Sequence, residues 1–467
     1  MIIENSRIAG ITLGTYTPEP DVNVTIAADA HVMDLTGYHV MPGVVDTHAH
    51  FGTLSQAPDQ SYVNKLWLGH GVTTVREVGC MGNGLELVSS EAQRSAQDRI
   101  TAPRIVPYVR FGQGGEGVIN GKQAAAWVSW VAGQGAKGVK FFGAAPEQFK
   151  AALAECNRLG LGSACHHSPQ YMPRVNALIS ARWGLRSVEH HYGLAEAMLT
   201  GSTVQRYEPD YNYMDEPDRF LNAGAVWLQS VEPGSQVWEN VLNEFLSLGT
   251  TLSPTFNIYI AARDAARART YEWHEDYTAP QLWDFYSPNP KSHGSFQNDW
   301  TTSKEAIWRH AYQRWMAFVN DYKNKGGRVT AGSDSGFIYS TYGFGIIQEL
   351  ELLQEAGFDP LEVVKAATLN GAELLDLADE LGTLAPGKLA DIIVVKENPL
   401  ANFKVLYGSG HLRMTSDGMQ RTQGVVYTIK NGIVYDAGKL REDVKEQVVQ
   451  EWKQQGRYDQ RPRTTRP

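Results

Sequence analysis

Residues 41–52 form the stretch MPGVVDTHAHFG, and this stretch decides the fold. A short apolar run leads directly into His48 and His50, which are separated by one alanine. Alternate residues of a β-strand point to the same face, so both imidazoles project together from the end of one strand. Two histidines placed in this way form half of a divalent metal site.

Outward from this stretch, short apolar runs alternate with helical stretches from about residue 44 to residue 375. This alternation is typical of repeated βα units around a parallel sheet. Eight such units predict an α/β fold, a closed (β/α)8 barrel of the TIM type. The eight expected strands are 44–48, 72–78, 104–111, 137–142, 161–166, 185–190, 250–256 and 328–334.

Two connecting helices can be placed from their apolar spacing. One begins at Pro146, a residue favoured at the first helical position, and ends at Gly160. The other carries an aromatic face that includes Trp308 and Trp315, and it ends before Gly326.

The two ends of the chain have a different, β-rich pattern. In the later segment Asn431 and Gly432 predict a tight type I′ turn between two strands. The expected division is a small β-sandwich domain from 1–40 plus 381–445, the barrel over 41–380 with insertions at about 195–245 and 260–325, and a polar C-terminal extension over 446–467.

Composition narrows the class of partner. The chain has 467 residues, with 42 Lys and Arg against 51 Asp and Glu, a net charge of −9. This balance argues against nucleic acid or an anionic membrane as the main partner, since both require a basic surface. No apolar run approaches the length of a membrane span, about 20 residues, and the first residues lack the basic start of a secretory signal. We expect a cytoplasmic protein that acts on a small-molecule substrate, with no nucleic-acid or membrane partner.

Residues of ligand type also end other expected strands. Lys140 ends the fourth strand, His166 the fifth, His190 the sixth and Asp334 the eighth. An isolated His-x-His would be weak evidence, but barrel enzymes place their chemistry at the C-terminal ends of the strands. The recurrence therefore predicts one metal site at that end of the barrel, and the alternative is a set of unrelated polar residues that cap strands.

Several motifs together resemble the amidohydrolase superfamily of metal-dependent hydrolases, in the branch of prolidase-like and imidazolonepropionase-like enzymes. They are PGVVDTHAH, GVTTVREVG, GVKFF, SVEH, GSDSG and the closing run ATLNGAELLDLADELGTLAPGKLADIIVV. The resemblance covers nearly the whole chain. Barrels of this kind commonly associate, so we also expect a homo-oligomer.

The resemblance implies two divalent metal ions, with Zn2+ favoured. Of the matching positions, Lys140 would bridge the ions as an N6-carboxylated lysine, because a bare ammonium between two dications would be strongly repelled. A neutral or solvent-facing lysine and a mononuclear site are the alternative. The implied ligands are His48, His50 and Asp334 for one ion and His166 and His190 for the other.

Such a centre would supply hydroxide near neutral pH, with Asp334 as general base and acid. The expected reaction is hydrolysis of amide bonds, as in N-acyl amino acids, dipeptides or cyclic amides. The same site acting on esters, lactones or phosphotriesters is one alternative, and a non-catalytic scaffold is another. Deaminases of the superfamily typically have Glu three residues after the fifth-strand histidine, whereas this chain has Pro169.

Other candidate residues have weaker support. Tyr259 and His191 are candidate donors to the developing oxyanion, although strand alternation points His167 and His191 away from the metal ligands. Arg110 is the one candidate clamp for a substrate carboxylate. The acidic and aromatic segment 207–220 would favour a cationic substrate if it lines the barrel mouth, and otherwise is a charged surface loop.

Overall fold

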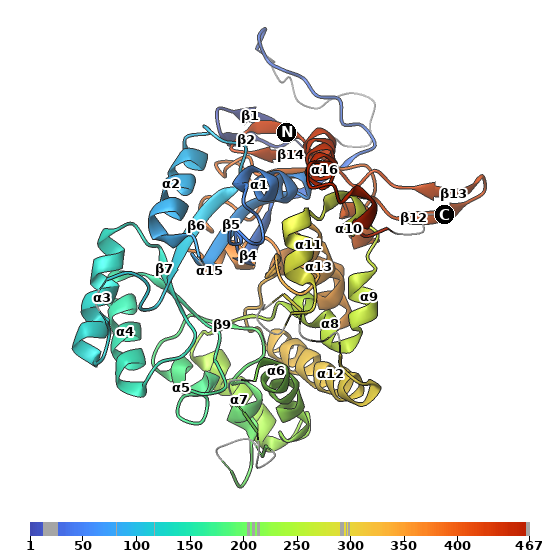
Figure 1. The fold of residues 1–467 in the computed structure, drawn as a ribbon. Coiled ribbons are helices and arrows are strands. Elements are labelled where there is room, and N and C mark those ends of the chain that lie inside the picture. The colour runs from blue at the N-terminus through green and yellow to red at the C-terminus, as the bar shows by residue number, and fades with distance from the viewer. Residues whose placement is uncertain are drawn as a thin grey trace.

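A parallel sheet of seven strands forms the centre of the computed structural model (Figure 1). Its strand order is β10-β9-β8-β7-β6-β5-β4. The strands are β4 (Val44–Ala49), β5 (Val72–Gly79), β6 (Arg104–Arg110), β7 (Gly138–Phe141), β8 (Gly162–Cys165), β9 (Ser187–Glu189) and β10 (Thr251–Ser253). The structure describes residues 1–12, 27–80, 82–115, 117–202, 206–207, 211–212, 215–289, 294–295, 297 and 299–463.

Residues 328–334 close the barrel between β10 and β4 without forming a strand. The backbone N–H of Leu252 donates to the carbonyl of Arg328 at 3.0 Å, and that of Thr47 donates to Ala331 at 3.0 Å. The α/β barrel is therefore confirmed, but the eighth expected strand is wrong, because this segment has only the single bridge at Val329. The chain leaves extended geometry at Asp334, whose φ is 46°.

Helices follow the strands and lie outside the sheet (Figure 1). The helix expected from Pro146 is α4 (Pro146–Leu159), and Gly160 ends it in the left-handed conformation with φ 67°. The helices outside the sheet are α1 (Gln60–Gly69), α2 (Gly84–Ala96), α3 (Gly121–Gly133), α4, α5 (Ala177–Arg182), α13 (Phe344–Glu355), α14 (Pro360–Ala366) and α15 (Leu369–Leu374).

The long connections on either side of β10 contain further helices. The longest is α12 (Thr302–Asn324), the predicted aromatic helix, in which Trp308 and Trp315 are buried. The other elements are η1 (Ala195–Met198), α6 (Glu216–Ala225), η2 (Val226–Leu228), α7 (Gln236–Ser247), η3 (Phe256–Tyr259), α8 (Ile260–Arg263), α9 (Ala265–Arg269), α10 (His274–Tyr277) and α11 (Pro280–Tyr286).

The two ends of the chain meet in antiparallel sheets at one side of the barrel (Figure 1). β3 (His39–Pro42) pairs with β11 (Ile392–Val395), and β11 pairs in turn with β14 (Val425–Lys430). The predicted tight turn joins β14 to β15 (Ile433–Asp436), and both of its residues have positive φ, as a type I′ turn requires. The remaining strands are β1 (Ile2–Glu4), β2 (Arg7–Gly10), β12 (Leu412–Thr415) and β13 (Gly418–Arg421).

The last long helix, α16 (Ala437–Gln454), corrects one expectation. The polar extension predicted from residue 446 is wrong as far as 454, because Val448 and Trp452 are buried in this helix. The Trp452 indole N–H donates to the carbonyl of Thr278 at 3.2 Å, which ties the helix to the barrel insertions. The last described element is η5 (Tyr458–Gln460), and η4 (Phe403–Leu406) lies between β11 and β12. Within the described ranges, no helix combines the length and apolar character needed to cross a membrane.

Candidate metal centre

All six residues predicted as ligands line one small cavity at the C-terminal ends of the barrel strands. The cavity has a volume of about 70 Å³, and aromatic and branched side chains form the rest of its wall. The lining residues are His48, His50, Lys140, Phe142, His166, His190, Phe220, Ile258, Tyr259, Asp334, Phe337 and Ile338.

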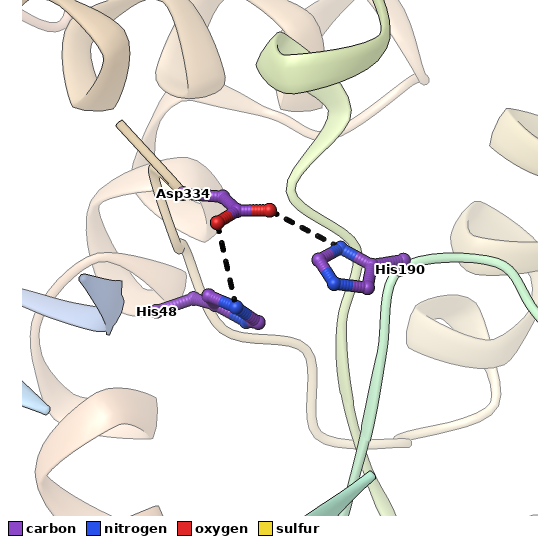
Figure 2. Close-up of side chains that lie close together, drawn as sticks. All are labelled: His48, His190 and Asp334. Atoms are coloured by element: carbon purple, nitrogen blue, oxygen red, sulfur yellow. Dashed lines mark ion pairs between the residues drawn. The ribbon is translucent and has the colours of Figure 1, made fainter. Parts of the chain in front are cut away.

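The Asp334 carboxylate is the point on which the imidazoles converge. Its Oδ1 atom lies 3.1 Å from Nε2 of His50 and 3.7 Å from Nε2 of His48. Its Oδ2 atom lies 3.8 Å from Nδ1 of His190 (Figure 2). One ligand atom from each of His48, His190 and Asp334 lies within 4.8 Å of the others. The ring of His166 is 4.8 Å from that of His190, between centroids.

Backbone geometry at the strand ends turns these side chains into the cavity. His190 has a φ of 64° and Asp334 a φ of 46°. Residues with a Cβ rarely adopt this conformation, and it persists where the surrounding structure holds it, often at functional sites. The His190 N–H donates to Ser253 O at 2.9 Å and the Asp334 N–H to His48 O at 2.7 Å, which holds both turns.

Lys140 reaches the same centre from β7. Its Nζ atom lies 3.4 Å from Nε2 of His48, and the side chain is buried. Burial lowers the pKa of the Lys140 amine to about 8. A charged ammonium beside the lone pair of a metal-binding imidazole would oppose a dication, whereas a carboxylated amine would not.

Three buried charged residues, Arg76, Glu77 and Glu189, lie behind the cavity, and the sequence motifs predicted no role for them. Glu189 accepts from Nδ1 of His48 at 2.5 Å, and Nη2 of Arg76 lies 2.8 Å from both of its oxygens. Burial opposes the charged carboxylate, but Arg76 and Lys140 outweigh it and lower the pKa of Glu189. Glu77 is also fully buried, with Oε2 3.8 Å from Nδ1 of His50. The signal was present in the sequence, since charges inside a buried strand require partners.

The histidines differ in the charge state that their surroundings favour. Burial lowers the pKa of His48 and of His190 well below the usual value, which favours the neutral, ligating form. Burial also acts to lower the pKa of His50, but Asp334 and Glu77 outweigh it and raise the pKa to about 9.

The other candidates lie at different distances from the centre. Tyr259 lines the cavity, and its hydroxyl donates to that of Tyr192 at 3.0 Å. The structure does not bring His191 to the cavity lining, because it packs among Tyr192, Tyr259, Trp308 and Trp315 and accepts from Trp227 at 3.3 Å. Its expected role as an oxyanion donor stays a prediction, and the lining of the cavity does not include this residue. His167 also faces away and bonds to Ser180 at 2.8 Å.

Two substrate-contact predictions fall beside the cavity. The guanidinium of Arg110 lies over the ring of Phe142, 5.1 Å from its centroid, and lines clefts of about 350 and 390 Å³ next to it. Of the segment 207–220, residues 208–210 and 213–214 lie outside the described residues, while Phe220 reaches the cavity wall.

Comparison with known proteins shows similarity to one family. Residues 247–434 match the family model described as the amidohydrolase family. This part of the chain is therefore similar to the amidohydrolase family. The recognition made from the sequence motifs is therefore confirmed.

Individual relatives of this chain are distant. It is 23% identical over 447 residues to an adenine deaminase of Staphylothermus marinus, a match that covers 92% of this chain but 58% of the relative. Its fold is similar to a Xaa-Pro dipeptidase with bound methionine, with a TM-score of 0.59, 19% identity and 93% and 94% of the two chains covered. Its fold is also similar to a putative prolidase from Bifidobacterium longum, with a TM-score of 0.59, 18% identity and 94% and 92% of the two chains covered. At these identities the solved structures show the fold alone.

The donor set of the cavity fits the divalent ions that the resemblance implies. Imidazole nitrogens and a carboxylate are ligands suited to Zn2+ and related ions. Both imidazoles of the His48–His50 pair present Nε2 to the same oxygen of Asp334, as a shared ion would require. Among the described side chains, both oxygens of Glu77 are buried without a hydrogen-bond partner. A cation in the cavity would balance that charge.

Proposed function

We propose that this protein is an amidohydrolase that hydrolyses amide C–N bonds with two divalent metal ions, most simply Zn2+. The convergence of four histidines, Lys140 and Asp334 on one cavity carries the proposal. In it, His48, His50 and Asp334 hold one ion, and His166 and His190 hold the other.

The proposal assigns Lys140 to the bridge between the ions as an N6-carboxylated side chain. Its Nζ atom lies beside Nε2 of His48, within the same buried centre. Carboxylation converts a cation into an anionic bidentate ligand, which removes the repulsion that an ammonium would exert on two dications.

In the proposed reaction, different residues of the chain transfer protons, exclude water and donate to the oxyanion. Divalent ions at this site would supply Lewis-acid activation of water and of the scissile carbonyl. Asp334 accepts the proton of the attacking water and returns it to the leaving nitrogen, since its carboxylate lies at the centre of the ligand set. Phe220, Phe337 and Ile338 form an apolar wall that excludes other water. Tyr259 contributes to that wall, and its hydroxyl is a candidate donor to the developing oxyanion.

The substrate class follows from the walls of the cavity and its neighbours. The apolar lining favours an acyl group or side chain without charge next to the scissile bond. Arg110, on the outer face of Phe142, supplies a guanidinium that can bind a substrate carboxylate. N-acyl amino acids and dipeptides combine both features, and cyclic amides share the scissile bond.

Adenine deamination is a second candidate, because an adenine deaminase is similar over 92% of this chain. The chain spans 58% of that relative, however, and Pro169 stands where the superfamily's deaminases typically carry a glutamate. Pro169 has no acid or base to offer, so amide hydrolysis is preferred.

A substrate panel with Zn2+-loaded protein tests the proposal. It contains N-acyl amino acids, dipeptides, cyclic amides, adenine, esters, lactones and phosphotriesters. We expect turnover of amides bearing a carboxylate, its loss in Asp334→Asn, and a higher KM with little change in kcat in Arg110→Ala. Turnover of adenine or of the esters, lactones or phosphotriesters alone would overturn the amide assignment. The homo-oligomeric state and cytoplasmic location expected from the sequence stay predictions, to be tested by light scattering and by cell fractionation.

A further inference from the structure

Both histidines of the His-x-His pair turn Nδ1 away from the cavity and toward a buried carboxylate. Nδ1 of His48 lies 2.5 Å from Oε2 of Glu189, and Nδ1 of His50 lies 3.8 Å from Oε2 of Glu77. Their Nε2 atoms both face Asp334. The pair thus has the carboxylates of Glu189 and Glu77 on its Nδ1 side and the carboxylate of Asp334 on its Nε2 side.

The contact behind His48 fixes the imidazole tautomer. An ionised carboxylate only accepts hydrogen bonds, so the proton of neutral His48 must lie on Nδ1 and the Nε2 lone pair must face the cavity. Glu189 also accepts from Arg76 at 2.8 Å and from the hydroxyl of Ser187 at 2.5 Å. Three donors therefore point at one carboxylate, and a neutral amide in its place could not accept from all of them.

Glu189 also connects the two halves of the ligand set. It is the last residue of β9 and directly precedes His190, whose ring centroid is 4.7 Å from that of His48. Its side chain holds His48 while its backbone carries His190. Glu189 thus contacts one of these ligands and adjoins the other along the chain.

The contact behind His50 is of a different kind. Glu77 pairs in register with Ala49, the residue between the two histidines, and its side chain is fully buried. At 3.8 Å its carboxylate is beyond hydrogen-bond distance, so it acts on the Nδ1 side of His50 through its charge. Neither oxygen has a hydrogen-bond partner among the described residues, and Arg76 is already engaged by Glu189.

We infer that Glu189 and Glu77 are positioning residues that set the two histidines to present Nε2 to one cation. The inference rests on the metal site of the proposed function. Carboxylates that accept from the second nitrogen of a metal-binding histidine orient the ring and raise its basicity, and their loss typically weakens metal affinity about 10- to 100-fold.

The test measures Zn2+ affinity of the metal-free full chain by competition with a chromophoric chelator. The variants are Glu189→Gln and Glu77→Gln, with Glu91→Gln as a matched control. Glu91 is a buried carboxylate on α2, outside the cavity, and it pairs with Arg94. We expect about 10- to 100-fold weaker binding in Glu189→Gln, a smaller loss in Glu77→Gln, and wild-type affinity in the control.

Two further readouts separate positioning from a general structural defect. The visible spectrum of the Co2+-loaded protein reports ligand geometry, and it should change in both site variants and not in the control. Glu77→Gln loses no hydrogen bond, so its metal-free form should melt near the wild-type temperature. The Glu77→Gln variant therefore still tests the inference if Glu189→Gln does not fold.

The outcomes are distinguishable. Wild-type protein that binds no ion would overturn the proposed function and this inference together. Wild-type binding with affinities and Co2+ spectra unchanged in both variants would overturn the positioning roles alone. Loss of affinity in Glu189→Gln but not in Glu77→Gln would overturn the role of Glu77.

Discussion

Replacement of Arg76 by methionine should strongly destabilise the barrel. The guanidinium is fully buried, donates from Nε to the carbonyl of Thr47, and reaches Ser187 and Glu189 on β9 at 2.9 and 2.8 Å. It therefore crosses the barrel interior from β5 to β4 and β9. Breaking a buried ion pair by removing one partner costs about 3–5 kcal/mol. The lost hydrogen bonds from the guanidinium to the uncharged acceptors Thr47 and Ser187 add at least about 1 kcal/mol each, and the methionine side chain recovers part of the packing.

The free energy of unfolding of metal-free Arg76→Met should thus fall by about 5 kcal/mol. Urea denaturation followed by tryptophan fluorescence measures the change, because buried tryptophans occur throughout the barrel. The double variant Arg76→Met/Glu189→Met is the matched control. Replacing both partners with apolar residues removes the uncompensated charge, so it should be more stable than Arg76→Met by about 2 kcal/mol or more. A loss below about 1 kcal/mol in Arg76→Met, or a double variant no more stable than Arg76→Met, would refute the buried ion pair.

Three further predictions follow from particular contacts. Lys140→Ala should lose turnover and regain part of it with added short carboxylic acids, measured as rate against acid concentration. Gly332→Ala should weaken Zn2+ binding and lower stability by about 1–3 kcal/mol, measured by chelator competition and urea denaturation, because its Cβ would lie 2.7 Å from that of His48. Burial lowers the pKa of His274 to about 4. The unfolded chain therefore binds this proton first as pH falls below about 6.5, and stability should be lost between pH 6.5 and 4. His274→Asn should reduce that loss by on the order of 3 kcal/mol, read from urea midpoints against pH; equal losses in both proteins would contradict it.

The sequence predicted most of the barrel because strand and helix signals agreed along the chain. Buried runs such as 72–78 and the helix from Pro146 to Gly160 have local patterns that packing reinforces. The segment 328–334 did not become a strand, because Gly332 packs against His48 and Asp334 turns out of extended geometry. Such close contacts between distant segments leave no periodic trace in a sequence.

The residues of the candidate site were predictable from the sequence, but their buried charged partners were not. Residues at strand ends could be listed from alternation, but the left-handed backbone at His190, which turns this ring into the cavity and His191 away from it, could not. Arg76, Glu77 and Glu189 were visible as charges within buried strands, but their partners lie far away in sequence. Arg76 and Glu189 are separated by 113 positions, so only the closed barrel brings them together.

The metal content of purified protein, measured by elemental analysis alongside the amide panel, tests the central claim most directly. We predict two zinc-like ions per chain, with turnover of carboxylate-bearing amides that chelation removes and added Zn2+ restores. A single ion would contradict the bridged centre and the role of Lys140. No ion, and no activity with any added divalent metal, would contradict the metal-dependent hydrolase itself.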